Sequence, residues 1–266
     1  MFFGRKAKYE TKSNVFVKLL DKKVDEFTVP EGVREIETEA FSDCSQLKSI
    51  VIPAGVTSIG RGAFWGCSSL SSLTIPSSVT SIGSYAFWRC SSLSSLVIPS
   101  GVTSIGDCAF SECSSLSLLV IPDSVTRIGD GAFSDCSSLT TLEVDKNNPE
   151  YCSIDGALFT KDQTTLILCA RGRTTYSIPS SVTCIGDLAF SGCRCLSSVE
   201  IPSSVVSIGD RAFSDCFSLS SLALPSSVTG IGDDAFEDCP KLTLRVLKGS
   251  YAEEYAKANE IKYETF

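Results

Sequence analysis

Apolar residues recur along most of this chain with a period of 23 residues. Eight units begin at a proline and keep the same phase, with one interruption: Pro30, Pro53, Pro76, Pro99, Pro122, Pro179, Pro202 and Pro225. Counting the proline as position 1, every unit has Val at 4, Ile at 7, Ala at 11, Phe at 12, Cys at 15 and Leu at 18. A repeat of this length predicts one supersecondary coil per unit, and stacked coils make a solenoid.

Each unit predicts two short strands on different faces of the coil. In the unit from Pro76, residues 93–98 read Leu-x-x-Leu-x-Ile, which is typical of the strand of a leucine-rich repeat. The Val-x-x-Ile segment from Val79 to Ile82 predicts the second strand. Strands of successive coils would lie in register, about 4.8 Å apart, and would form parallel sheets.

A Gly-x-x-Ala-Phe-x-x-Cys segment lies between the two strands. The residue after the glycine position is Ser, Thr or Asp in seven of the eight units, and these residues favour helix N-caps. We therefore expect a short helical turn that carries the phenylalanine inward, and an α/β solenoid overall. A calcium-binding stripe of aspartates is the alternative for this position.

Eight of the thirteen cysteines occupy position 15, where neighbouring coils would bring them near one another. Disulfides are one possibility at that spacing. An odd count and two equivalent neighbours for each interior cysteine favour reduced, buried thiols, which indicate a reducing compartment. Cys193-Arg-Cys195 is a weak hint of a metal site, because no second pair follows at ligand spacing.

The repeat is irregular at three places. Residues 145–178 form an enlarged island coil, in which 157–160 and 165–168 predict a hairpin. Arg245 stands where other units are apolar, so Leu244 and Val246 are expected to turn inward after a one-residue slip. Ser250 and Glu253 predict a capped terminal helix with Tyr251, Tyr255 and Ala258 on one side.

These features divide the chain into an N-terminal flank and cap (1–29), a repeat solenoid (30–247), and a C-terminal capping helix and tail (248–266).

Composition excludes several functions. The net charge is −8; residues 1–23 carry +5, which leaves −13 on the remainder. An acidic body repels phosphate, so nucleic acid is not an expected partner.

The chain has no histidine, which excludes triads, Cys-His dyads and histidine-containing zinc sites. We expect no enzyme activity, no cofactor and no metal. The apolar runs are short, so we expect no transmembrane helix.

The unit resembles the BspA-like leucine-rich repeat family. The pattern I-P-x-S-V-T-x-I-G-x-x-A-F-x-x-C-x-x-L, as in 75–93, carries the resemblance, together with Asn147-Asn148-Pro149 in the island and the ending at 249–256. The resemblance covers roughly residues 24–263. It implies a right-handed solenoid with ligand-binding potential, and members that are often surface or secreted proteins, some of them adhesins for host proteins. It supplies no catalytic residues.

The expected function is a monomeric, non-catalytic scaffold for protein–protein interaction, with a structural spacer as the alternative. Trp65 and Trp88 share one phase in adjacent units, with Arg61, Tyr85 and Arg89 nearby, and such residues carry interface energy. Packing of the two indoles between coils is the competing interpretation. If Met1 is the true start, the absence of a signal peptide indicates the cytoplasm, whereas the family indicates the cell surface or secretion.

Overall fold

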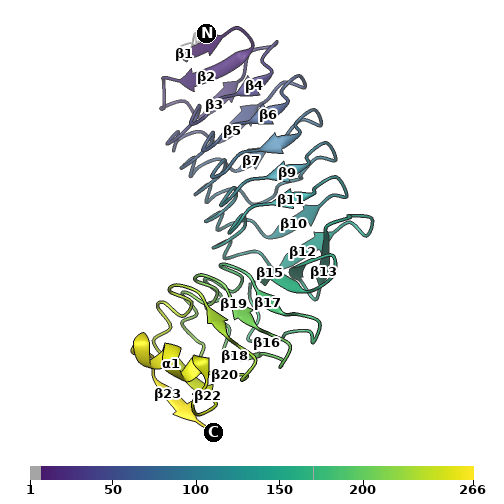
Figure 1. Cartoon of the computed structure of the whole chain (residues 1–266). Coiled ribbons are helices and arrows are strands. Elements are labelled where there is room, and N and C mark those ends of the chain that lie inside the picture. The colour runs from purple at the N-terminus through teal and green to yellow at the C-terminus, as the bar shows by residue number, and fades with distance from the viewer. Residues whose placement is uncertain (1–6, 170) are drawn as a thin grey trace. The chain divides into compact units, whose positions relative to one another are not determined.

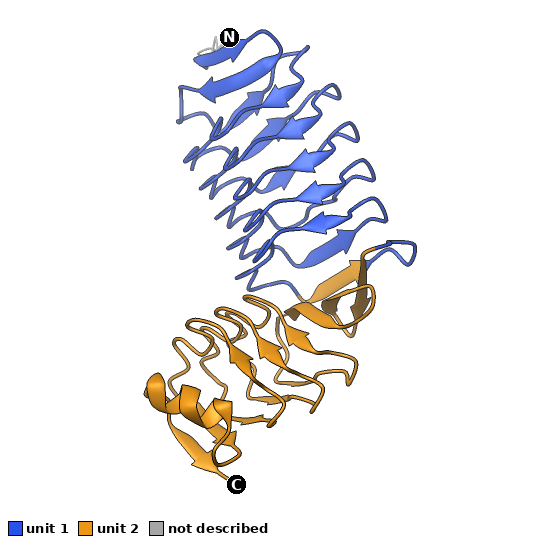
Figure 2. Cartoon of the chain, in the orientation of Figure 1, with its two compact units in different colours: residues 1–139, 144–149 blue, residues 140–143, 150–266 orange. Residues whose placement is uncertain are grey.

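The chain divides into two compact units that each stack successive coils into a solenoid (Figures 1 and 2). The computed structural model describes residues 7–169 and 171–266. Unit 1 comprises residues 1–139 and 144–149, and unit 2 comprises residues 140–143 and 150–266. The division falls at the start of the island, where the 23-residue phase is interrupted.

In unit 1 the Val-x-x-Ile segments form the predicted second row of strands. The sheet consists of β1 (Tyr9–Lys12), β2 (Val15–Leu19), β4 (Glu35–Ile36), β6 (Ser58–Ile59), β8 (Ser81–Ile82), β9 (Ser104–Ile105) and β11 (Arg127–Ile128), in this order. β1 and β2 pair antiparallel, and the later strands pair parallel. Ser58 pairs with Ser81, which stands one repeat later, so the sequence period is also the register of the sheet.

The leucine-rich segments form the other row. β3 (Glu26–Thr28), β5 (Ser49–Val51) and β7 (Ser72–Leu73) make a parallel sheet in unit 1. Residues 95–98 have the same phase but form no strand, and the pattern resumes with β10 (Leu118–Ile121). The next strand of this phase, β12 (Thr141–Val144), lies at the division, with residues 141–143 in unit 2. The leucine-rich signature therefore predicts the path of the chain at every coil, whereas strand pairing varies from coil to coil.

Unit 2 has two sheets and one helix within the described residues. One sheet runs β13 (Tyr151–Ile154), β14 (Ala157–Thr160), β15 (Thr165–Cys169), β17 (Cys184–Ile185), β19 (Ser207–Ile208) and β21 (Gly230–Ile231). The other runs β16 (Thr175–Ser177), β18 (Ser198–Glu200), β20 (Ser221–Leu224), β22 (Thr243–Val246) and β23 (Tyr263–Thr265). The helix is α1 (Tyr251–Ala258), and no helix of the described ranges has the length and apolar character that crossing a bilayer requires.

The phenylalanines at position 12 stack along the core of each unit. In unit 1 the rings of Phe41, Phe64, Phe87 and Phe110 follow one another at centroid distances of 5.0, 5.1 and 5.1 Å and are nearly parallel. All four are fully buried. Phe190, Phe213 and Phe236 form the corresponding stack in unit 2. Each coil thus buries one ring against the ring of the coil before it, as the repeat predicts.

The expected helical turn between the two strands is wrong, and a series of β-turns replaces it. The amides of Ala63, Trp65 and Cys67 donate to carbonyls three residues earlier, at 3.3, 3.0 and 3.1 Å. The alternate amides, those of Gly62, Phe64 and Gly66, donate instead to the next coil, at 2.9, 2.7 and 2.8 Å. A helix would use every amide within its own segment. Because half of the backbone amides in this segment donate to the neighbouring coil, the helix cannot form.

In every unit the residues at positions 10 and 14, within these turns, have a positive φ and adopt the left-handed conformation. The residues are Glu39, Asp43, Gly62, Gly66, Tyr85, Arg89, Cys108, Glu112, Gly131, Asp135, Leu188, Gly192, Arg211, Asp215, Asp234 and Asp238. Only four are glycine, although this conformation costs other residues about 1–2 kcal/mol. The tertiary stack therefore imposes the turn on residues that would not adopt it alone.

The aspartates at position 9 connect coils instead of capping helices. Oδ1 of Asp187 accepts from the backbone N–H of Asp210 at 2.8 Å, and Oδ1 of Asp210 accepts from the N–H of Asp233 at 2.9 Å. The N-cap expectation is wrong because no helix follows. The carboxylates satisfy amides of the next coil, which explains this row of aspartates without a bound cation.

The predicted island hairpin is confirmed, and a third strand joins it. β14 and β15 are antiparallel around residues 161–164, and β13 pairs with β14 on the other side. Asp155 and Gly156, with φ of 47° and 67°, make the two-residue turn between β13 and β14. An Asp-Gly pair is a strong hairpin signal.

The predicted slip in the last coil is also confirmed. Leu222 pairs with Leu244, a spacing of 22 instead of 23 residues, and Leu244 and Val246 are fully buried while Arg245 is exposed.

The capping helix forms as predicted, but its buried face differs from the expected one. The N–H of Glu253 donates to Oγ of Ser250 at 3.3 Å, while the Glu253 carboxylate accepts from the N–H of Gly249 at 2.6 Å. Ala252 and Ala256 are buried, Tyr255 is half-buried, and Tyr251 and Ala258 are exposed. The buried face therefore consists of Ala252 and Ala256, with Tyr255 at its edge, where the tyrosine hydroxyl donates to the carbonyl of Gly232 at 3.1 Å and the ring meets Phe236.

Candidate functional site

Unit 1 carries an aromatic cluster on its turn side, where positions 8–14 of successive coils lie one above another. Trp65 and Trp88 occupy position 13 of adjacent coils, and their ring centroids are 4.9 Å apart with the planes inclined at 68°. The Trp65 side chain is 37% exposed, which makes it one of the large apolar side chains on the surface. Trp65 therefore lies at the surface, in contact with the half-buried indole of Trp88.

Gly62 lies against the Trp65 indole. It stands three residues earlier, and a Cβ at Gly62 would come within 3.6 Å of Cε3 of Trp65. In the next coil Tyr85 stands at the position of Gly62 and meets Trp88 edge-on, with centroids 6.4 Å apart. Tyr85 has a φ of 60°, so the turn itself directs this side chain.

Two arginines complete the cluster by stacking on the rings. The guanidinium carbon of Arg89 lies 4.1 Å from the centroid of the Trp88 ring, and that of Arg61 lies 5.5 Å from the Tyr85 ring. Nε of Arg89 also pairs with Oε2 of Glu112 at 2.9 Å. The structure thus brings all five predicted residues into one set of contacts. We call Arg61, Trp65, Tyr85, Trp88 and Arg89 the turn-face patch.

Glu112 is a neighbour of the patch that sequence reasoning missed. It stands at the same repeat position as Arg89, one unit later, and the two side chains have opposite charges. Because residues 23 apart are adjacent in the stack, this pairing was readable from the register. The pair is solvent-exposed, so its contribution to stability is small, and its effect is to hold the guanidinium over the Trp88 face.

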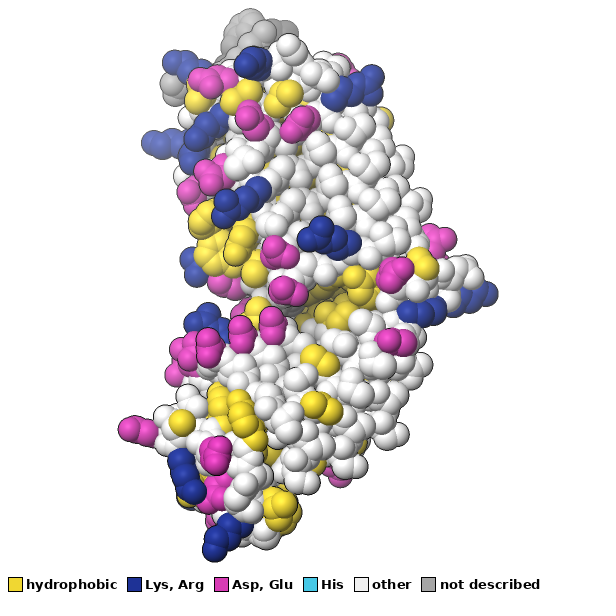
Figure 3. Space-filling model, in the orientation of Figure 1, with side chains coloured by type: hydrophobic (Ala, Val, Ile, Leu, Met, Phe, Trp, Pro, Cys, Tyr) yellow, Lys and Arg dark blue, Asp and Glu magenta, His cyan; other side chains and the backbone are white. Residues whose placement is uncertain are grey.

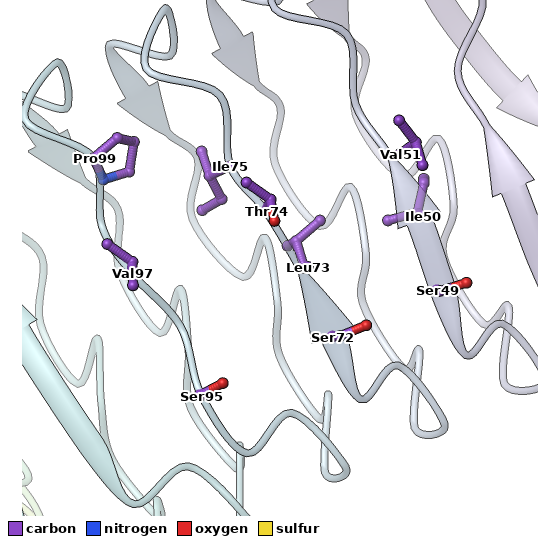
Figure 4. A pocket seen from close by; sticks show the side chains of 10 residues that line it. All are labelled: Ser49, Ile50, Val51, Ser72, Leu73, Thr74, Ile75, Ser95, Val97 and Pro99. Atoms are coloured by element: carbon purple, nitrogen blue, oxygen red, sulfur yellow. The ribbon is translucent and has the colours of Figure 1, made fainter.

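A second surface feature lies on the strand side of unit 1 (Figure 4). It is a shallow groove of about 500 Å³ across three successive coils, lined by Ser49, Ile50, Val51, Ser72, Leu73, Thr74, Ile75, Ser95, Val97 and Pro99. None of these residues is charged, and Val51 and Val97 are 59% and 77% exposed. On the face that Figure 3 presents, many charged side chains of unit 1 lie toward the left, and others lie near its middle and right edge. The sequence signal for this groove is a valine at one outward strand position of two coils, Val51 and Val97.

The thiols at position 15 have a structural role. Sγ of Cys67, Cys90 and Cys113 donates to the carbonyl oxygen of the phenylalanine of the preceding coil, at 3.1, 3.2 and 3.2 Å. Burial raises the pKa of the Cys90 thiol to about 12, so it is protonated at neutral pH and is not a nucleophile.

The possible metal pair does not converge. Cys193 is 5% exposed, whereas Cys195 points to solvent. Within the described ranges, no group of three or more His, Cys, Asp or Glu side chains is arranged to hold a metal ion.

The repeat, the buried phenylalanine stack and the inter-coil hydrogen bonds coincide with a match to a known family. Residues 10–148 and 170–262 match the BspA type leucine rich repeat region, in six copies. The chain belongs to this BspA-type family. The chain matches no curated protein.

Several solved structures resemble this chain over most of its length. A leucine rich cell surface protein from Faecalibacterium prausnitzii A2-165 is 26% identical, with a TM-score of 0.69; the match covers 95% of this chain and 83% of the other. A leucine-rich repeat protein from Eubacterium ventriosum ATCC 27560 is 25% identical, with a TM-score of 0.69 and coverages of 90% and 69%. The pneumococcal vaccine antigen PcpA is 20% identical, with a TM-score of 0.72 and coverages of 89% and 78%, and shows the fold alone.

Proposed function

We propose that this chain is a non-catalytic, right-handed leucine-rich repeat scaffold that binds a protein partner through the turn-face patch. The observation that carries the proposal is the placement of Trp65 and Trp88 in adjacent coils at a position where most units have serine. The fold does not need an aromatic residue there, since coils with Ser111 or Ser134 stack in the same way. Trp, Tyr and Arg are the residue types enriched in interface hot spots, and this cluster combines exposed Arg61, Trp65 and Arg89 with half-buried Tyr85 and Trp88.

The setting of the patch agrees with a binding role. Large apolar side chains on the surface of a repeat protein gather at the faces that contact partners. The F. prausnitzii structure is described as a cell surface protein, which supports a role in adhesion or in binding a host protein.

A structural spacer is the second candidate, and one observation favours it. Trp88 lies between Trp65 on one side and the guanidinium of Arg89 on the other. Much of the Trp88 surface is therefore already covered by residues of the patch itself, as expected if the two indoles pack neighbouring coils together.

The double variant Trp65→Ser, Trp88→Ser separates the two functions. A random peptide display library is selected on the intact wild-type protein, and the clones are then tested on the variant. A binding scaffold predicts clones that lose binding on the variant, while the melting temperature changes little because serine is the residue of other coils. A spacer predicts a large loss of melting temperature and no patch-dependent clones. The matched control is Val51→Ser, Val97→Ser, which alters the strand-side groove of the same unit and should leave those clones bound.

A further inference from the structure

The surroundings of the turn-face patch are acidic on both sides within unit 1. On the N-terminal side the preceding coil presents Glu37, Glu39 and Asp43, all exposed. On the other side the next two coils carry Asp107, Glu112, Asp130 and Asp135, at positions 9 and 14 of their units. Against these seven carboxylates, positions 8–14 of the five coils have two basic residues, Arg61 and Arg89, both in the patch.

Two acidic residues of the preceding coil lie close to the turn that carries Trp65. A Cβ at Gly62 would lie 3.4 Å from Cγ of Glu39 and 3.6 Å from Cε3 of Trp65, so both side chains cover this glycine. Oδ1 of Asp43 lies against Gly66, and the Asp43 amide donates to the Trp65 carbonyl at 2.6 Å. Trp65 is therefore bordered by a carboxylate at each end of its own turn.

The basic groups of the patch, and Lys22 beside it, have partners of their own. Arg89 is paired with Glu112 and lies over Trp88, and Arg61 lies over Tyr85. Lys22, beyond the first coil, donates to the backbone carbonyl of Ser42 at 2.8 Å. None of the ion pairs that the described residues form involves Glu39 or Asp43. An incoming cation would meet an aromatic face with negative charge beside it, which is the arrangement that favours cation–π contact.

We propose that the turn-face patch docks a cationic protein segment. An apolar or aromatic residue of the segment contacts Trp65 and Trp88, and flanking Lys or Arg side chains pair with the carboxylates of the coils on either side of the patch. This inference rests on the proposed function and adds the chemistry of the partner. Coils repeat at 5.0–5.1 Å, as the phenylalanine rings show. The Glu39 and Asp107 coils are three steps apart, roughly 15 Å, which an extended segment spans in about four residues.

The peptide clones that depend on Trp65 and Trp88 test this inference. We expect them to be enriched in Lys and Arg on both sides of an aromatic or aliphatic residue, and to bind more weakly as salt is raised. The variant Glu39→Gln, Asp43→Asn should weaken them roughly three- to tenfold at low salt, as the loss of two exposed ion pairs implies. The matched control Glu31→Gln, Asp123→Asn removes the same charge from exposed positions of unit 1 outside positions 8–14, and should leave binding unchanged.

The outcomes distinguish the two proposals. Patch-dependent clones that are neutral or acidic, or that bind the Glu39→Gln, Asp43→Asn variant as well as wild type, would overturn the cationic partner and leave the binding patch standing. If no clone depends on the two tryptophans, both proposals fail.

Discussion

The thiol of Cys90 donates a hydrogen bond to the backbone carbonyl of Phe64, with 3.2 Å between sulfur and oxygen. The acceptor stands 26 residues earlier, on the preceding coil, and the same bond recurs from Cys216 to Phe190 in unit 2. Position 15 therefore needs a side chain that is small, apolar and able to donate. Cysteine meets all three needs, and alanine would leave a buried carbonyl without this donor.

We predict that the stacked thiols resist alkylation in the folded protein. Cys195 is exposed, whereas Cys90 is fully buried and hydrogen-bonded. Iodoacetamide at neutral pH should label Cys195 first and leave Cys90 unlabelled until the protein is unfolded. Peptide mass spectrometry of native and urea-treated samples checks this, and rapid labelling of Cys90 in the native protein would contradict the buried donor role.

Stability should fall at alkaline pH, and Cys90 should account for part of the loss. Burial raises its pKa from 9.0 to about 12 in the folded protein. Between these values the unfolded chain has lost the proton and the folded chain has kept it, so the free energy of unfolding decreases as pH rises. The stabilising contribution is complete below about pH 9 and is lost at about 1.4 kcal/mol per pH unit above it.

Urea unfolding of Cys90→Ser, on both sides of pH 9, measures this contribution. Serine keeps a donor but does not titrate in this range, so the variant should lose stability with pH less steeply than wild type. Cys195→Ser removes an exposed thiol and serves as the control with the wild-type slope. Equal slopes for all three proteins would show that Cys90 titrates alike in both states.

Gly106, at position 8 of its unit, is required by close approach of the preceding coil. A Cβ at Gly106 would lie 2.3 Å from the backbone nitrogen of Ser84. Gly106→Ala should therefore destabilise unit 1 by about 1–3 kcal/mol through overpacking. Gly230→Ala is the control in unit 2, where the nearest atom to the new Cβ is 3.8 Å away, and it should be neutral or slightly stabilising. Chemical denaturation measures the free energy of unfolding of both variants. Equal values for Gly106→Ala and Gly230→Ala would contradict the close approach at Gly106.

The phenylalanine stack should dominate the stability of each unit. Phe213 is fully buried, between Phe190 at 4.8 Å and Phe236 at 5.6 Å. Phe213→Ala should cost about 3–5 kcal/mol, since it removes a core aromatic and leaves a cavity. Phe217→Ser, in the same coil, replaces a 37% exposed ring with the residue that most other units carry, so its effect should be small. A similar loss in both variants, measured by thermal unfolding, would contradict the assignment of Phe213 to the core.

The periodicity of apolar side chains predicted the features of the fold that depend on which residues are buried. The inward rows, the island hairpin, the slip that buries Leu244 and Val246, and the terminal helix were all visible in the spacing of apolar residues. The same spacing predicted that Trp65, Trp88, Tyr85, Arg61 and Arg89 lie together, because residues one period apart become neighbours when coils stack. It did not predict the turn between the strands, since a Ser or Asp before Ala-Phe has the same local preference in a helix cap as in this turn.

The sequence by itself determined the solenoid, its core and the places where the period fails, because burial of apolar side chains follows a fixed phase in every coil. Only the tertiary structure decided the path of the backbone hydrogen bonds. Alternate amides of each turn bind a coil 22 residues away, and that competition replaces the helix with β-turns and places Tyr85 and Arg89 in left-handed conformations. The charged surroundings of the turn-face patch depend on the same stacking, since Glu39 and Trp65 become neighbours only across a coil boundary.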